Sequence, residues 1–212
     1  VVISTIELEQ NIDYLLIPTI LKEKDISLIQ ERILASRSFK RNDFVKSEDS
    51  FNIDKLGSAC QIILKNTEYI VADNTKNNKE ILDNIFENST LVINNKEEIV
   101  DSLLDRHNKS SVVIPNTDIA LFHTLDKELA EPFIIISSLN NVLAMKDAMG
   151  EEQRVEYFII MASPNEQEYT ELLSQISIAI LDDKIFGEAL TSKNKNFILT
   201  KVELILKNYI LQ

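Results

Sequence analysis

The chain has 212 residues, of which 44% are hydrophobic and 26% charged, and its formal net charge is −12. This length and composition suit one complete domain and part of another, and they exclude a chain that is disordered throughout. A sequence pI near 4.7 disfavours direct binding to nucleic acid or to an anionic membrane surface. The longest apolar runs are strand-length, well short of the roughly 20 residues that span a bilayer, so we expect no membrane span.

The residue types also restrict the chemistry. One cysteine excludes an internal disulfide, and no group of cysteines and histidines has the spacing of a zinc site. With only three glycines, the chain has no glycine-rich loop for a nucleotide phosphate. We therefore expect a cytoplasmic protein without a metal or cofactor.

The first 37 residues predict an incomplete α/β unit. Residues 1–6 and 14–17 read as strands, and Asp25 reads as the N-cap of a helix whose apolar face runs from Ile26 to Leu34. Two strands and a helix of this size cannot form a core. We expect them to be the C-terminal part of a domain whose other strands precede residue 1. Residues 38–52 are polar and lack apolar periodicity, which is typical of a linker.

Residues 53–212 predict a second unit in which helices flank strands, that is, an α/β fold. Asp54 is the expected N-cap of a helix that continues to about Ile70, and two further helices are predicted at 77–86 and 95–106. Strands are expected at 111–114, 119–122, 132–137, 142–145 (a short edge strand) and 155–162, and helices are expected to begin near 165, 183 and 196.

Three side chains are candidates for chemistry. His107 follows Arg106 near a predicted helix end, where a solvated or capping histidine is the simplest interpretation. His123 ends an apolar strand, where a rigid sheet would hold a nucleophile or a ligand at the solvent boundary; a half-buried histidine bonded to the backbone is the structural alternative. Cys60 lies among apolar residues of a predicted helix and is expected to be a buried structural thiol.

Two motifs resemble a known family. Residues 112–124, VVIPNTDIALFHT, resemble the phosphoacceptor region of mannitol/fructose-type enzyme IIA domains of the bacterial phosphoenolpyruvate:sugar phosphotransferase system (PTS). Residues 158–164, FIIMASP, are similar to a strand of the same family. The resemblance implies a mixed β-sheet flanked by helices over residues 53–212. It also implies that His123 accepts a phosphoryl group from phospho-HPr, with Asn116, Thr117 and Thr124 as candidate contacts of that group.

The front of the chain resembles a second PTS component. Residues 1–33 are similar to the C-terminal end of a galactitol-type IIB domain, and residues 1–37 would be its last part. A IIB tail, a linker and a IIA domain follow one another in mannitol-operon-type transcriptional activators. The resemblance therefore implies the regulatory C-terminal module of a sugar-responsive activator, not an enzyme. Its partners would be phospho-HPr and other IIA or IIB proteins, DNA would be reached only through domains outside this chain, and a homodimer stays open.

Two other functions remain open at this stage. The domain could be a working IIA component that passes phosphate to a sugar permease, although the resemblance places Asn116 where transport members carry a histidine. It could also be a docking module that is no longer phosphorylated.

Overall fold

The computed structural model describes residues 2–4, 14–16, 53–73, 77–109, 112–147, 149–181 and 184–211. The chain divides into two compact units, Val1–Asn52 and Ile53–Gln212. In the first unit, β1 (Val2–Ser4) and β2 (Tyr14–Leu16) form a parallel pair with Ile3 opposite Leu15. The helix predicted after Asp25 and the linker predicted at 38–52 lie outside the described residues.

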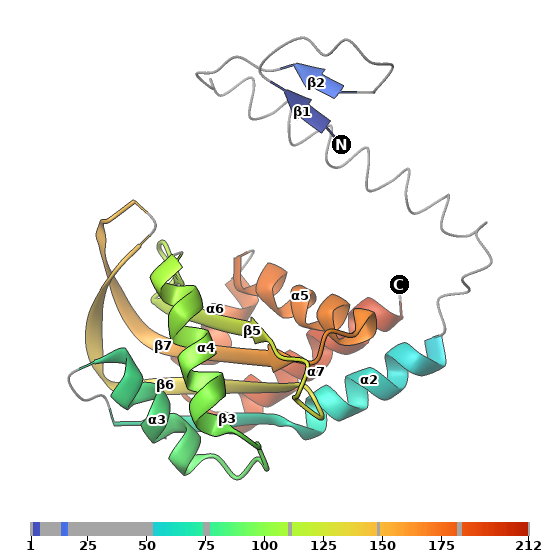
Figure 1. The fold of residues 1–212 in the computed structure, drawn as a ribbon, viewed down its shortest axis with the longest axis horizontal. Coiled ribbons are helices and arrows are strands. Elements are labelled where there is room, and N and C mark those ends of the chain that lie inside the picture. Colours follow the sequence, from blue (N-terminus) through green and yellow to red (C-terminus); the bar gives the residue numbers. More distant parts are fainter. Residues whose placement is uncertain are drawn as a thin grey trace. The chain divides into compact units, whose positions relative to one another are not determined.

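The second unit is built on one five-stranded sheet (Figure 1). Its strands lie in the order β3 (Thr67–Ala72), β6 (Phe133–Lys146), β7 (Glu152–Ser163), β5 (Ile119–Leu125) and β4 (Val113–Ile114). β3 runs parallel to β6 and β5 runs parallel to β7, whereas the β6–β7 and β4–β5 pairs are antiparallel. The mixed sheet with flanking helices confirms the predicted fold class.

Helices cover both faces of this sheet. The helices are α2 (Ile53–Lys65), α3 (Asn78–Asn88), α4 (Lys96–Lys109), α5 (Gln167–Leu181), α6 (Lys184–Thr191) and α7 (Lys195–Ile210). One hydrophobic cluster joins α2, α5, α6 and α7 to one face, and a second joins α3 and α4 to the other (Figure 1). No helix in the described ranges is long and apolar enough to cross a membrane.

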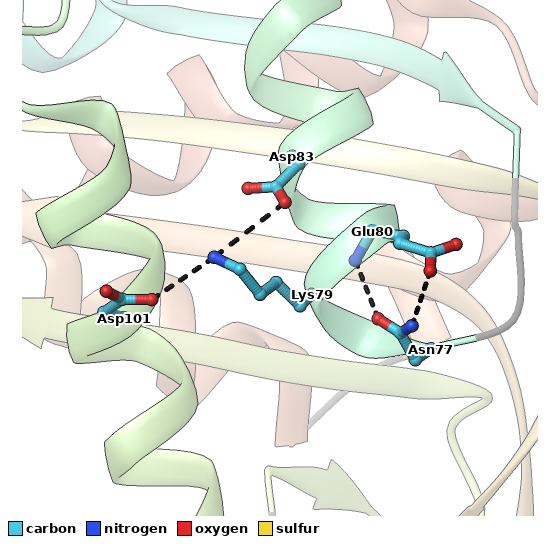
Figure 2. Close-up of polar contacts among 5 residues, drawn as sticks. All are labelled: Asn77, Lys79, Glu80, Asp83 and Asp101. Atoms are coloured by element: carbon cyan, nitrogen blue, oxygen red, sulfur yellow. Dashed lines mark hydrogen bonds and ion pairs between the residues drawn. The ribbon is translucent and has the colours of Figure 1, made fainter.

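Polar contacts fix the start of α3 and its position against α4 (Figure 2). The Asn77 side-chain oxygen accepts a hydrogen bond from the Glu80 backbone N–H at 2.9 Å, and the Asn77 amide donates to the Glu80 carboxylate at 2.8 Å. Such a reciprocal cap satisfies donors that the first helical turn leaves free. Lys79 on α3 reaches Asp101 on α4 at 3.3 Å and Asp83 on its own helix at 3.9 Å.

Two strands differ from the sequence prediction. The helix predicted to continue to Ile70 ends at Lys65, and the next residues form the edge strand β3. Burial in β3 alternates over its first four residues only, and the Thr67 hydroxyl donates to the Ile63 carbonyl at the end of α2. The predicted short edge strand at 142–145 is the far half of β6, which continues from 133 to 146 through an irregularity after Ser138.

Candidate functional site

His123 lies near the carboxyl end of β5, as the apolar strand before it predicts. Its register partner on β7 is Met161. Alternation along the strand places His123 on the same face as Ile119 and Leu121, and its side chain is exposed whereas theirs contribute to the first cluster. A strand that pairs with β7 along its length therefore presents this imidazole to solvent.

On the side of β5 that faces away from β7, the backbone near His123 has no paired strand among the described residues. β4 pairs only with Ile119 and Ala120, and one further backbone bond, from the Leu121 N–H to the Val112 carbonyl, measures 2.8 Å. Beyond that bond, no strand among the described residues follows β5 on this side.

The surroundings of His123 keep its ring neutral. Partial burial is the main influence and lowers the pKa of His123 below the ordinary 6.5, and the positive charge of Arg106 lowers it further. The Leu121 backbone acts in the opposite direction because its interaction with the ring favours the protonated form. At neutral pH one ring nitrogen therefore carries a free lone pair, the form needed by a nucleophile.

Arg106 is a site residue that the sequence interpretation missed. It is exposed on α4, and among the described residues no carboxylate forms an ion pair with it. One turn earlier on α4, the Ser102 hydroxyl bonds the Thr124 hydroxyl at 2.7 Å and ties the helix to β5. The positive charge of Arg106 acts on His123 and would therefore attract an anion attached to that ring.

The three candidate contacts of a phosphoryl group are not gathered around His123. Thr124 follows His123 on the strand, so its side chain lies on the opposite face, buried and bonded to Ser102. Asn116 and Thr117 form the β4–β5 turn at the other end of β5, roughly 13 Å of strand away from His123.

That turn has a structural account of its own. Asn116 and Asp118 have positive φ angles of 63° and 54°, which asparagine and aspartate tolerate well. The Thr117 hydroxyl donates to the Ile114 carbonyl at 2.8 Å and accepts from the Ile119 N–H at 3.3 Å. The family motif therefore includes residues that shape the hairpin as well as the histidine, and a single sequence does not separate the two.

His107 is neither solvated nor a cap, contrary to the sequence prediction. Helix α4 continues to Lys109, and the half-buried His107 ring lies against Phe122, with centroids 5.7 Å apart. Its Nε2 bonds the Asn78 side-chain amide of α3 at 3.1 Å, and burial lowers the pKa of His107. Its Nδ1 is buried without a partner among the described residues. His107 thus joins α3, α4 and β5.

Cys60 is buried on α2, as predicted. Burial is the main influence on the pKa of its thiol and raises it, the charge of Lys207 lowers it, and Glu203 raises it. A thiol held in the protonated form is a poor nucleophile, which agrees with a structural role.

Comparison with known proteins gives the family of the second unit. A family model described as phosphoenolpyruvate-dependent sugar phosphotransferase system, EIIA 2, matches residues 63–204. Because this match covers more than half of the chain, the chain belongs to that family. It carries a PTS IIA-type domain, the class of domain that carries phosphoryl groups in this system. No curated protein matches the chain.

Similar solved structures include three PTS-related proteins. The nitrogen regulatory protein IIA-Ntr from Neisseria meningitidis has 17% identity and a TM-score of 0.49, over 69% of this chain and 97% of its own. A protein assigned as PTS IIA (PtxA) from Streptococcus mutans has 14% sequence identity and a TM-score of 0.49, and the match covers 75% of this chain and 97% of that protein. A protein assigned as a PTS IIA domain from Streptococcus pyogenes M1 GAS has 13% sequence identity and a TM-score of 0.46, and the match covers 70% of this chain and 94% of that protein. The family assignment stands on the family model.

Proposed function

We propose that His123 accepts a phosphoryl group from phospho-HPr and that this modification controls a regulatory module. The observation that carries the proposal is the His123 site itself: an exposed imidazole at the carboxyl end of β5, kept neutral by partial burial and by Arg106. The two histidines of the chain differ in this respect, because His107 is half-buried and bonded to Asn78.

The chemistry of transfer follows from the neutral ring. One ring nitrogen keeps its proton, and the lone pair of the other nitrogen attacks phosphorus. A new N–P bond forms on His123 while the P–N bond to the donor histidine breaks and its electron pair returns to the donor ring. The Leu121 backbone, whose interaction with the ring raises the pKa of His123, favours the positive charge that develops on the imidazole.

Arg106 supports the product of this reaction. A phosphoryl group adds about −1.5 to −2 charges at neutral pH to a chain whose net charge is already −12. Phosphorylation of most positions on such a surface would be opposed by like charges. The positive charge of Arg106, which already acts on the His123 ring, offsets that repulsion.

The regulatory role is supported by the order of the two units. Residues 1–33 resemble the end of a galactitol-type IIB domain, and this order of IIB-like and IIA-like parts is the arrangement of mannitol-operon-type activators. In such a protein, a charge change at His123 would alter a contact made by the IIA-like domain. We accordingly propose that the chain is the C-terminal module of a sugar-responsive transcriptional activator, with mannitol as the associated sugar.

A second candidate function is phosphoryl relay to a IIB protein, which the exposure of His123 favours. A group that is open to the donor protein is equally open to an acceptor, and family membership fits both functions.

One labelling experiment separates these functions. The 212-residue chain is incubated with enzyme I, HPr and phosphoenolpyruvate labelled in the phosphoryl group, repurified, and then mixed with IIB proteins. Label that stays on His123 supports a regulator, and label that moves to a IIB protein supports a relay component. Absence of label in the wild-type chain contradicts both and leaves a docking module.

A further inference from the structure

A groove opens at the end of the sheet where β5 finishes and where β3 and β6 begin. Its volume is about 480 Å³. Three connections form its walls: residues 65–66 after α2, residues 90–95 between α3 and α4, and residues 126 and 128–131 between β5 and β6. Ile99 and Phe133, both buried, close its base. The groove therefore lies at the end of the sheet that carries His123, and His123 is not one of its lining residues.

One wall of the groove is apolar and open to solvent. Val92 has 97% of its surface exposed, and its neighbour Leu91 is half-buried. Across the groove, Leu129 is also half-buried. An isolated exposed valine needs no explanation, but apolar side chains gathered around a concave base are typical of a surface that another molecule covers.

The rim of the groove is acidic. Asp126, Glu128 and Glu131 line it, and Lys65 is the one cation among the described lining residues. Glu131 accepts a hydrogen bond from the Asn66 amide at 2.8 Å, and Asp126 accepts one from the Glu128 N–H at 2.9 Å. None of the three carboxylates forms an ion pair with a described residue. Uncompensated carboxylates beside an apolar base favour a cationic, partly apolar occupant.

We propose that this groove docks a segment of a partner protein that inserts an apolar side chain and places lysine or arginine against the three carboxylates. This goes beyond phosphoryl acceptance, because docking needs no reaction at His123. A second copy of the chain is disfavoured as the occupant since each copy carries a net charge of −12, and a nucleic acid is disfavoured for the same reason. Asp126 follows the last residue of β5, so a docked partner would lie at the end of the sheet where His123 is exposed.

The test uses a probe with both properties: an acetylated, amidated pentapeptide of alternating lysine and leucine. It is titrated into the ¹⁵N-labelled 212-residue chain while amide chemical shifts are followed by NMR. We expect saturable shifts concentrated in residues 90–95 and 126–131. Replacing leucine by serine, or lysine by glutamate, in the peptide should remove most of the effect, since the groove offers both an apolar base and carboxylates.

Variants of exposed residues decide whether the groove is responsible. Val92→Ser and Glu128→Lys should each weaken peptide binding about fivefold or more, because one removes apolar contact and the other reverses a rim charge. The matched controls, Val142→Ser and Glu152→Lys, change exposed residues elsewhere, in the β6–β7 hairpin, and should leave affinity unchanged.

Three results would overturn the proposal. The first is a peptide effect spread evenly over the acidic surface, and the second is equal binding by the groove variants and their controls. The third is a shift of the groove amides with protein concentration in the absence of peptide, which would identify a second copy as the occupant.

Discussion

At the scale of single residues, the charge of Arg106 acts on His123 although the two residues come from different elements. The sequence motif points to His123, because an apolar strand followed by a polar histidine is visible in the chain itself. Arg106 carries no such signal. It reads as one more charged residue near a helix end, and its relation to His123 arises only when α4 packs against β5 through the Ser102–Thr124 bond.

This pairing predicts the behaviour of Arg106→Gln. Removing the guanidinium removes one of the causes that lower the pKa of His123, so that pKa should rise in an NMR titration of the ring. The rate of phosphorylation should fall on the order of tenfold, because a hydrogen bond to a charged group contributes about 1.5 kcal/mol or more.

The matched control is Arg154→Gln, which changes an exposed arginine paired with Glu156. It should alter neither the His123 titration nor the rate. A slower reaction with an unchanged His123 titration would contradict the proposed proximity of Arg106 and the ring.

His107 predicts a pH dependence of stability. Burial lowers the pKa of the folded His107, so the unfolded chain binds its proton more readily. The stability that neutral His107 contributes is therefore fully present above the unfolded pKa and is lost as the pH falls below it. The free energy of unfolding in urea should be smaller at about pH 5.5 than at about pH 7.5.

The variant His107→Leu isolates this contribution. It should reduce the difference between the two pH values without abolishing it, because the pKa of His123 is also lowered in the folded chain. An identical pH dependence in the wild type and in His107→Leu would show that His107 does not titrate as its burial and its bond to Asn78 imply.

At the scale of elements, the sequence predicts most helices and strands, and its failures have one cause. Helices α3, α4 and α5 and strand β5 occur where apolar periodicity and caps place them. Strand β3 was missed because Thr67 continues the helical spacing of α2, and a short edge strand has little alternation of its own. Local pattern does not reveal that β6 supplies a parallel partner for these residues.

The α3–α4 pair offers a comparison between a cap and an ion pair. Asn77→Ala should lower the free energy of unfolding by about 1 kcal/mol, because the first turn of α3 loses its side-chain acceptor. Lys79→Ala should change it by less than about 0.5 kcal/mol, because the lysine and Asp101 are both largely exposed. Urea denaturation of the two variants measures both values, and a larger loss for Lys79→Ala would reverse the expected order.

At the scale of the whole molecule, the division of the chain predicts that residues 53–212 fold alone. Both hydrophobic clusters lie entirely within this range, and so do the sheet and the His123 site. A fragment of residues 53–212 should unfold in one cooperative transition and should be phosphorylated at the rate of the 212-residue chain. A fragment that folds but reacts much more slowly would show that the site needs the first 52 residues.

The central claim is that His123 is the phosphoacceptor, and intact-mass analysis tests it most directly. The 212-residue chain, His123→Ala and His107→Gln are each incubated with phosphoenolpyruvate, enzyme I and HPr. We expect the wild type and His107→Gln to gain an acid-labile mass of about 80 Da and His123→Ala to gain none. A wild type that gains no mass, or a His123→Ala variant that still does, would contradict the claim.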